Sequence, residues 1–352
     1  MERFRVGIDV SAKSLEVAYR SGRGGVVRQT FDNEAAKHAA LVRHLRKRAG
    51  KAIVRVVLEA TGVYHLEVAI ALARAGFEVM VVNPRAAAHY AKAELQRSKT
   101  DRLDAEMLLN YAESMKFRQW QPPATTVLQL RAIARRIYAV TRIVADEKNR
   151  RHAAEQVEDI RVIDRSIAST IKALGKEIDK LYAEALKVIA SDRQLSRRFE
   201  LLQSVKGIAE KSGIAILAEL SVLPADMTDR EWVAHAGLDP RHFESGTSVR
   251  GKTRISKRGN KYLRAALYQP AKTACRFQRG VDEFSARLRE RGKQPVLVHV
   301  AVMRKLLVAI HAMFDTDQEF DGRRFTPAAA VAVGTAEIAD VAISAVSIAT
   351  GR

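Results

Sequence analysis

The first third of the chain alternates short apolar runs with longer amphipathic segments. The runs at 4–10 (FRVGIDV), 53–58 (IVRVVL) and 77–82 (FEVMVV) are rich in β-branched residues and predict buried strands. Two more strand-like runs, LEVAYR and VVRQTF, flank the turn sequence SGRGG and predict a hairpin or meander. Amphipathic segments predict helices at 33–49, 63–75, 85–95 and 101–113. The order of three strands, helix, strand, helix, strand and helix predicts a three-layer α/β unit with a mixed sheet.

A proline-rich step, Gln121-Pro122-Pro123, ends this unit, and the pattern then changes to that of long helices. Between Ala124 and Leu174 the sequence contains no glycine and no proline. Apolar residues recur at steps of three and four, close to a heptad, at Ile160, Ile163, Ile167, Ile171, Leu174, Ile178 and Leu181. Two arrangements fit this seam: a helical hairpin that packs on itself, or a coiled coil between chains.

The rest of the sequence predicts another domain and a tail. A second boundary falls near Leu201, and after Phe325 the chain is rich in alanine and valine, with no clear site chemistry. The expected fold class is α/β plus α. The predicted segments are an α/β domain at 1–120, a helical, coiled-coil-like middle at 121–200, a C-terminal domain at 201–315 and a tail at 316–352.

Basic residues exceed acidic ones, and the excess is concentrated in one segment. The chain has 60 lysines and arginines against 40 aspartates and glutamates, a formal net charge of +20. Residues 241–279 contain eleven basic residues and one acidic residue, which is half of that excess. A charge run is often only a solvated face, but the near absence of carboxylates here favours nucleic acid as the partner. The candidate nucleic-acid-binding residues are Arg250, Lys252, Arg254, Lys257, Arg258, Lys261 and Arg264.

Other features narrow the class of protein. The single cysteine, Cys275, excludes a disulfide framework and a cysteine-rich zinc site. The N-terminal sequence MERFRVGIDVSAKS lacks the apolar core of a signal peptide, and no uninterrupted apolar run is long enough to span a bilayer. The basic segment is broken by glycines and is not an amphipathic membrane-surface helix. We expect a cytoplasmic protein with no membrane partner.

Four carboxylates occupy positions where strands end and a helix begins. Asp9 ends the first strand, Glu59 ends the fourth, and Asp101 and Asp104 share one face of a helix start. Strand ends and helix starts of such a sheet gather at one edge, where four carboxylates would repel each other unless cations lay between them. Such oxygen ligands suit Mg²⁺ or Mn²⁺, and two such metals support phosphodiester chemistry. The alternative is that Asp101 and Asp104 only stabilise a helix N-terminus.

The last third combines a glycine turn with a serine in the basic segment. In LLQSVKGIAEKSGIAILAEL, Gly207 and Gly213 are expected to separate two short helices in a helix-hairpin-helix element, whose turn would offer amides to phosphate. Ser245 precedes Gly246 inside the basic segment, and a serine becomes a nucleophile when a base or metal takes its proton. A serine before glycine is also a common turn residue, and Ser248 and Ser256 compete for the same role.

Taken together, the motifs resemble one family, the insertion-sequence-110 family of DEDD transposases. The N-terminal match rests on VGIDVSAKSLEVA, on VVLEATGVYHLEVAIALARAGFEVMVVNPRAA and on SKTDRLDAEMLLNYA. The C-terminal match rests on LLQSVKGIAEKSGIAILAEL, AGLDP, the Ser-Gly pair and RISKRGNKYLR. The resemblance covers roughly residues 4–312, so the tail lies outside it.

The resemblance implies an RNase H-like (RuvC-like) domain whose four acids fall on Asp9, Glu59, Asp101 and Asp104, and a catalytic serine that falls on Ser245. It also implies recombination of donor and target DNA guided by a structured noncoding bridge RNA, and assembly as a dimer of dimers. The helical middle segment would then be an oligomerisation element.

The predicted function is that of a transposase or recombinase that cleaves, exchanges and rejoins DNA through a transient phosphoserine link. Because the covalent link keeps the phosphodiester energy, no ATP is needed. Two rival functions remain open. One is a metal-dependent endonuclease of the Holliday-junction type that uses water, and the other is a nucleic-acid-binding protein without activity.

Overall fold

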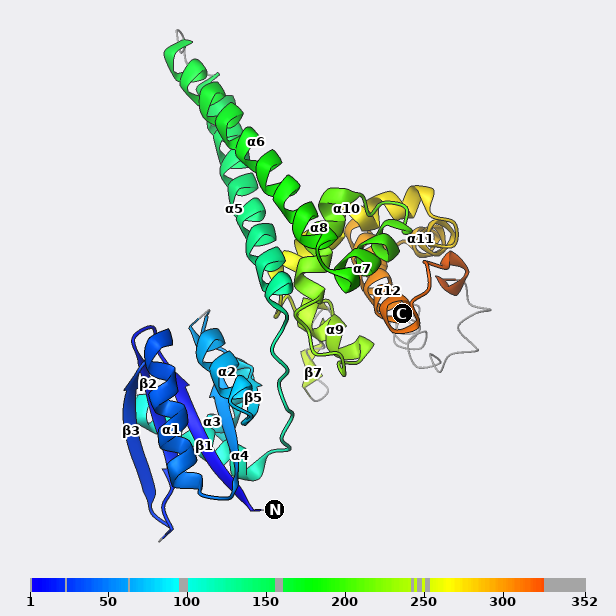
Figure 1. Cartoon of the computed structure of the whole chain (residues 1–352). Helices are drawn as coiled ribbons and strands as arrows, with labels where there is room; N and C mark the ends of the chain where they lie inside the picture. The colour runs from blue at the N-terminus through cyan, green and yellow to red at the C-terminus, as the bar shows by residue number, and fades with distance from the viewer. Residues whose placement is uncertain are drawn as a thin grey trace. The chain divides into compact units, whose positions relative to one another are not determined.

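The computed structural model describes residues 2–22, 24–62, 64–94, 101–155, 161–241, 244–245, 249–250 and 254–325. The side chains of 101–103, 244–245, 249–250 and 324 are not among the described parts. The chain divides into two compact units, residues 1–122 and 123–352, each with its own core (Figure 1).

The N-terminal unit is built on a five-stranded sheet with the order β3-β2-β1-β4-β5. β1 pairs antiparallel with β2 and parallel with β4, so the predicted mixed sheet is confirmed. The strands are β1 (Arg3–Val10), β2 (Ser14–Arg20), β3 (Val26–Asp32), β4 (Ile53–Glu59) and β5 (Glu78–Val82). Val6, Ile8 and Val10 of β1 point to one face of the sheet, because side chains alternate along a strand.

Helices cover both faces of this sheet and complete the three layers. The helical elements are η1 (Ala35–Lys37), α1 (His38–Ala49), α2 (His65–Arg74), α3 (Pro84–Ala93) and α4 (Asp101–Ser114). α1 and α2 pack on the face of Val6 and Ile8, whereas α3 and α4 pack on the opposite face around Val57. The helix predicted from residue 33 begins at His38, after a short 3₁₀ turn, because the backbone is still extended at Glu34, with φ of −121° and ψ of 135°.

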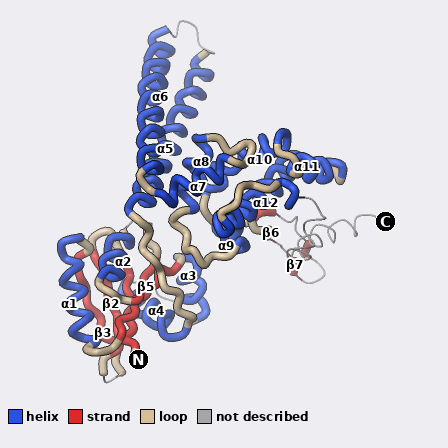
Figure 2. Tube along the Cα trace, turned by 45° about the vertical axis from the view of Figure 1, so that its right-hand side comes forward, coloured by secondary structure: helices blue, strands red, loops and turns tan. Residues whose placement is uncertain are grey.

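The C-terminal unit is helical and begins with a long hairpin of α5 (Thr125–Ala154) and α6 (Arg161–Ala190), which lie side by side in Figures 1 and 2. Ile167, in the middle of the predicted seam, is buried within the single chain, and Ile171, Leu174, Ile178 and Leu181 are partly buried. Ile163 is exposed, and Ile160 lies outside the described residues. The described seam therefore packs mainly within the hairpin, and a coiled coil between chains is not needed to cover it.

The remaining helices pack around the base of this hairpin. They are α7 (Arg193–Gln203), α8 (Glu210–Leu220), α9 (Asp229–Ala236), α10 (Lys261–Phe277), α11 (Val281–Glu290) and α12 (Pro295–Thr316), followed by η2 (Gly322–Phe325). Val127 and Ala185 of the hairpin share one core with Leu306 and Phe325. The boundary predicted near Leu201 therefore does not separate two compact units, and Phe320 and Phe325 of the predicted tail pack on this core.

The predicted helix-hairpin-helix needs a correction. Gly213 does not lie in the turn but inside α8, where a Cβ would come within 2.9 Å of the Phe199 ring, so it permits close packing of α7 on α8. Gly207 does lie in the turn, with φ of 111°. The neighbouring amides already donate inside the chain, Lys206 to Gln278 Oε1 at 3.0 Å and Ile208 to the Val205 carbonyl at 2.9 Å. This turn packs on α10 instead of offering those amides to phosphate.

Among the described residues, α12 is long and apolar enough to cross a membrane by length and composition, although the sequence analysis expected no such segment. Two cations, Arg304 and Lys305, interrupt its apolar sequence. Val302, Leu306 and Ile310 form one buried stripe on it, so α12 is the central core helix of the C-terminal unit.

Candidate functional site

Two of the predicted acids lie at the same edge of the sheet. β1 and β4 are parallel and in register, with Ile8 beside Leu58, and Asp9 and Glu59 are the next residues of each strand. Both carboxylates belong to the face covered by α3 and α4, because they follow Gly7 and Val57 at a spacing of two. Both residues are partly buried. We call this place, at the carboxyl ends of β1 and β4, the acid edge.

A glycine in β1 determines how closely α4 approaches the acid edge. A Cβ at Gly7 would overlap the Ala105 carbonyl oxygen and the Leu109 amide, and would stand 2.8 Å from the carbonyl carbon of Leu108. Only a residue without a side chain allows the α4 backbone to lie directly on β1. Asp9 is two residues further along the same face of the strand.

The direction of α4 places its first turn at the acid edge. Arg20 of β2 lies beside the beginning of β1, and its Nη2 donates to Asn110 Oδ1 at 3.1 Å, in the second half of α4. Just beyond the helix, the Phe117 ring lies 3.9 Å from the Arg55 guanidinium, near the beginning of β4. α4 therefore runs antiparallel to β1, and its N-terminal residues Asp101 and Asp104 lie toward the carboxyl ends of the strands.

A single amide side chain ties together the loops that follow the two strands. Asn33 Nδ2 donates to the Ser11 carbonyl at 2.8 Å and to the Tyr64 carbonyl at 3.3 Å. These carbonyls belong to the loops after Asp9 and Glu59. Asn33 Oδ1 lies 3.0 Å from Nε2 of the buried His38, which donates to it because the amide nitrogen faces the two carbonyls. Burial lowers the pKa of His38 below 6.5, and the charge of Glu67 offsets this only in part, so the ring is neutral at pH 7.

The donor set at the acid edge fits a hard divalent cation in its chemistry, since carboxylate oxygens from two strands and one helix start are the ligands that Mg²⁺ and Mn²⁺ take. The backbone brings Asp9, Glu59 and Asp104 to one edge, and Asp101 stands there by its backbone, its side chain lying outside the described parts. Among the described side chains, no three acids, histidines or cysteines already stand close enough to form a cation site.

The predicted basic residues lie between residue 250 and the first turn of α10. Arg254, Lys257, Arg258 and Lys261 are exposed, and within the described part of the chain no carboxylate pairs with them. Arg264 differs, because its Nη1 donates to the Ala236 carbonyl at 2.8 Å and closes the end of α9. Lys252 lies outside the described residues, and Arg250 is described only by its backbone.

Ser245 is placed by its backbone in a short hairpin. β7 (Glu244–Ser245) pairs antiparallel with β8 (Val249–Arg250), and Ser245 stands opposite Val249. Ser248 lies outside the described residues. The third candidate, Ser256, donates its hydroxyl to Asp239 Oδ1 at 2.5 Å, which gives it a structural role between β6 (Pro240–Arg241) and β9 (Arg254–Ile255).

The basic loop from Ser256 to Asn260 is held tightly against α9. Gly237 ends that helix with a left-handed φ of 65°, and the Lys257 amide donates to its carbonyl at 3.1 Å. The Asn260 amide donates to the His235 carbonyl at 2.7 Å. A Cβ at Gly259 would overlap that same carbonyl, so the loop depends on glycine there. Lys257 itself has φ of 52°, a conformation that its surroundings must impose.

A buried carboxylate fixes the far end of this loop. Glu219 of α8 is 2% exposed and accepts hydrogen bonds from Arg135 Nε at 2.8 Å, Arg131 Nε at 3.3 Å and Asn260 Nδ2 at 2.7 Å. Asn260 is also the N-cap of α10, accepting from the amides of Tyr262 and Leu263. The Arg135 guanidinium lies 4.6 Å from the Tyr262 ring. The hairpin, α8 and the basic loop thus share one polar network.

The residues that organise both places were not predicted from the sequence. Gly7, Asn33, Glu219 and Asn260 touch the acid edge or the basic loop without carrying the predicted chemistry. One signal was present: a glycine inside an apolar strand indicates a close backbone approach. The partners of Asn33 and Glu219 are distant in sequence, and no local pattern reveals them.

The segments matched by models of known protein families include the acid edge and the basic loop. A model of the DEDD transposase domain of the IS110 family matches residues 6–156, which include the acid edge. A second model, described as transposase IS116/IS110/IS902 family, matches residues 199–286, which include the basic loop and Ser245. The chain is 26% identical over 327 residues to the pilin gene-inverting proteins of Moraxella bovis and Moraxella lacunata. The alignment covers 92% of this chain and 99% of each relative.

Both family models describe transposases of the same group, they match in the expected order, and they cover both units of the structure. The chain belongs to the IS110 family of transposases.

Proposed function

We propose that this transposase cleaves and rejoins DNA strands with Ser245 as the nucleophile and with the acid edge as its metal-binding centre. The observation that carries the proposal is the meeting of Asp9, Glu59 and the first turn of α4 at one edge, which Gly7 makes possible. The names of the relatives support the reaction class, because inverting a gene requires two DNA sites to be cut, exchanged and resealed.

In this proposal Asp9, Glu59, Asp101 and Asp104 hold the cation, and Asn33 keeps the two strand-end loops in place around them. A bound divalent cation would supply charge stabilisation at the scissile phosphate and its leaving oxygen. The carboxylates would contribute their oxygens as ligands. Lys257 and Arg258 of the basic loop and Arg254 of β9 are exposed, and these three would neutralise the DNA backbone.

Ser245 performs the covalent step. Its Oγ bonds to the scissile phosphorus, the bond from phosphorus to the 3′ oxygen breaks, and the hydroxyl proton ends on that oxygen. The product is a phosphoserine link and a free 3′ hydroxyl. Attack by a 3′ hydroxyl from the exchanged strand reverses the step and restores Ser245, so one phosphodiester replaces another. The step requires Ser245 and an acid edge, from the same protomer or another, to meet at one phosphate.

We further propose that a structured noncoding bridge RNA guides the choice of donor and target DNA, and that protomers assemble as a dimer of dimers. The surplus of 20 positive charges supports binding of more than one nucleic acid. Exposed apolar residues near the start of α6, Val162 and Ile163, support an additional contact between hairpins.

The deciding experiment is detection of a covalent protein–DNA adduct on a denaturing gel, with a pre-nicked DNA end of the element as substrate. Wild type is expected to form the adduct, and Ser245→Ala is expected to lose it while still binding DNA. Ser256→Ala and Ser248→Ala serve as matched controls that keep the adduct. If wild type cleaves DNA in Mg²⁺ without ever forming an adduct, the chemistry uses water and the endonuclease alternative is correct.

A further inference from the structure

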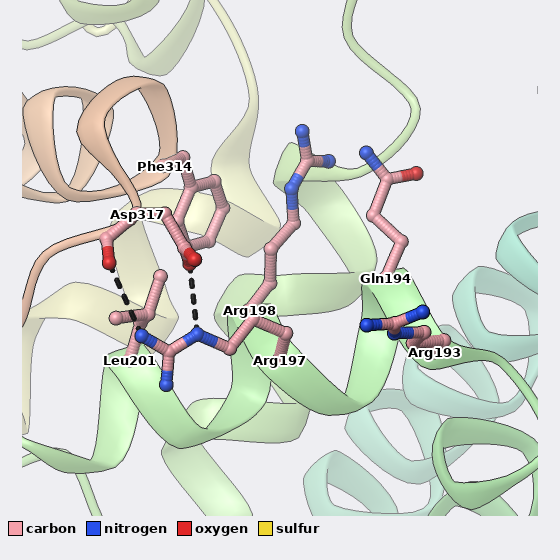
Figure 3. Close-up of a pocket in the computed structure, with 7 residues that line it drawn as sticks. All are labelled: Arg193, Gln194, Arg197, Arg198, Leu201, Phe314 and Asp317. Atoms are coloured by element: carbon pink, nitrogen blue, oxygen red, sulfur yellow. Dashed lines mark hydrogen bonds and ion pairs between the residues drawn. The ribbon is translucent and has the colours of Figure 1, made fainter.

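A cavity of about 620 Å³ lies in the C-terminal unit, between α7 and the end of α12 (Figure 3). It is far in sequence from both the acid edge and the basic loop. Arg193, Gln194 and Arg198 of α7 line one side of it, and Phe314 and Leu201 provide its apolar wall. A volume of this order is that of an ordinary small-molecule site.

One arginine of the cavity, Arg197, is bound to Asp317, another residue of the lining. Arg197 Nε donates to Asp317 Oδ1 at 2.8 Å, and Arg197 Nη2 donates to the Asp317 carbonyl at 3.1 Å. Asp317 ends α12 in the left-handed region, with φ of 53°. This pair fixes the end of α12 against α7, and its two charges cancel each other.

The other two arginines are not neutralised by contact. Within the described part of the chain, the guanidinium groups of Arg193 and Arg198 form no hydrogen bond and no ion pair. The Arg198 guanidinium lies 4.9 Å from the centre of the Phe314 ring, and Figure 3 shows both side chains among those that line the cavity. Burial lowers the pKa of Arg198, and the charges of Asp315 and Asp192 offset this only in part.

The carboxylates around the cavity bind other groups. Asp192 caps α7 through the amides of Gln194 and Leu195 and accepts the Thr126 hydroxyl at 2.6 Å. Asp315 Oδ2 lies 3.1 Å from His311 Nδ1. A half-buried arginine without a hydrogen-bonding anion is costly, because the contact of Arg198 with the Phe314 ring does not replace the hydrogen bonds to water that the guanidinium has lost.

We propose that this cavity binds one unpaired nucleotide of a nucleic-acid strand, with Arg193 and Arg198 on its phosphate and its base against the apolar wall. The assignment rests on the proposed nucleic-acid function and adds a second site to it. Arginine forks match phosphate oxygens. Phe314 and Leu201 suit a base that has left its stack, and the Gln194 amide can donate to and accept from a base edge. A duplex phosphate alone would need no apolar wall.

Fluorescence of oligonucleotides tests the site without requiring cleavage. The probes are a single-stranded RNA and a single-stranded DNA of the same sequence, each with one 2-aminopurine, and the corresponding DNA duplex. Arg193→Gln combined with Arg198→Gln is expected to bind both single strands about tenfold more weakly than wild type and to lose the 2-aminopurine signal. Binding of the duplex is expected to change less than twofold.

The matched control removes two charges elsewhere in the same unit. Arg136 and Arg142 are exposed on α5 and have no described partner, so Arg136→Gln with Arg142→Gln loses equal charge. Gln194→Ala, at an exposed position, weakens the signal without disturbing the fold. Equal loss of binding to both single strands supports the proposed site, and loss of binding to RNA alone supports the site with an additional contact to the ribose. The proposal is overturned if the control pair weakens single-strand binding equally, or if the Arg193 and Arg198 variant weakens duplex binding equally. Neither result depends on Ser245.

Discussion

Glu219 and Asn260 are joined by a hydrogen bond of 2.7 Å that links α8 to the N-cap of α10. Burial opposes ionisation of Glu219, but the hydrogen bond from Arg135 and the charge of Arg131 outweigh it, so the pKa of this glutamate lies below its ordinary value. The carboxylate is therefore charged at neutral pH, and it fixes Asn260 at the point where the basic loop becomes a helix.

Glu219→Gln is expected to lower the free energy of unfolding by about 2–4 kcal/mol, because two arginines lose their counter-charge. Asn260→Asp is the informative companion variant. Aspartate is a good N-cap, so the helix end is preserved, but a second carboxylate then faces Glu219. We expect both variants to unfold at a lower urea concentration than wild type. If Asn260→Asp is as stable as wild type, Asn260 acts only as a cap and the link to Glu219 contributes nothing.

Gly7→Ala is expected to destabilise the N-terminal unit by about 3 kcal/mol, because a methyl group there would overlap the α4 backbone. DNA cleavage should fall with it, since α4 carries Asp101 and Asp104. The control is Gly22→Ala, where nothing lies within 4 Å of the added methyl group. Urea unfolding followed by circular dichroism measures both. Equal stability of the two variants would show that α4 does not lie directly on β1.

Arg254, Lys257 and Arg258 are expected to contribute to the salt dependence of DNA binding. Changing all three to glutamine should weaken binding to DNA of any sequence and reduce the slope of log K against log salt by about one per residue. Lys172, Lys176 and Lys180, exposed on α6, provide a control set of equal charge. A slope that responds equally to both sets would mean that the basic loop has no special contact with DNA.

In the hairpin, buried and exposed apolar residues lie close together in sequence, so substitutions can distinguish an effect on folding from an effect on assembly. Ile167 is 9% exposed, so Ile167→Asp combined with Ile171→Asp is expected to unfold the hairpin. Val162 and Ile163 are 73% and 52% exposed, so changing both to glutamate should leave the helices intact. If these hairpins join protomers, the second variant lowers the particle mass in light scattering while its circular dichroism is unchanged. An unchanged mass would place the contact between protomers elsewhere.

Protonation of His38 is expected to loosen the acid edge. Its pKa in the folded chain lies below the ordinary value of 6.5, so the unfolded chain binds the proton more readily. The stability it contributes is complete above pH 6.5 and is lost as pH falls toward the folded pKa. The midpoint of thermal unfolding, measured from pH 8 to pH 5, should fall less steeply in His38→Gln than in wild type. Identical profiles would show that His38 is not buried as a neutral ring.

Local pattern was sufficient for the elements and for the acid edge. Short runs rich in β-branched residues predicted β1, β4 and β5, and the strand ends of such a sheet gather at one edge, so Asp9 and Glu59 were expected there. The parallel pairing of β1 with β4 is seen only in the structure. The resemblance to the family also rests on short contiguous segments of the sequence. Charge counting located the basic loop, since an excess of cations over 39 residues needs no fold to be seen.

Only the tertiary structure shows which residues pack against the predicted positions. Whether the Ile167 seam faces its own chain or another depends on where α5 lies, and the period of a helix is the same in both cases. Gly213 was predicted to lie in a turn, but it packs on Phe199 inside a helix. The reason for a glycine there is the neighbouring helix, which leaves no room for a side chain. Arg264 reads as one more phosphate ligand but closes α9. Contacts between residues distant along the chain, such as Glu219 with Asn260, arise from packing and leave no periodic trace in the sequence.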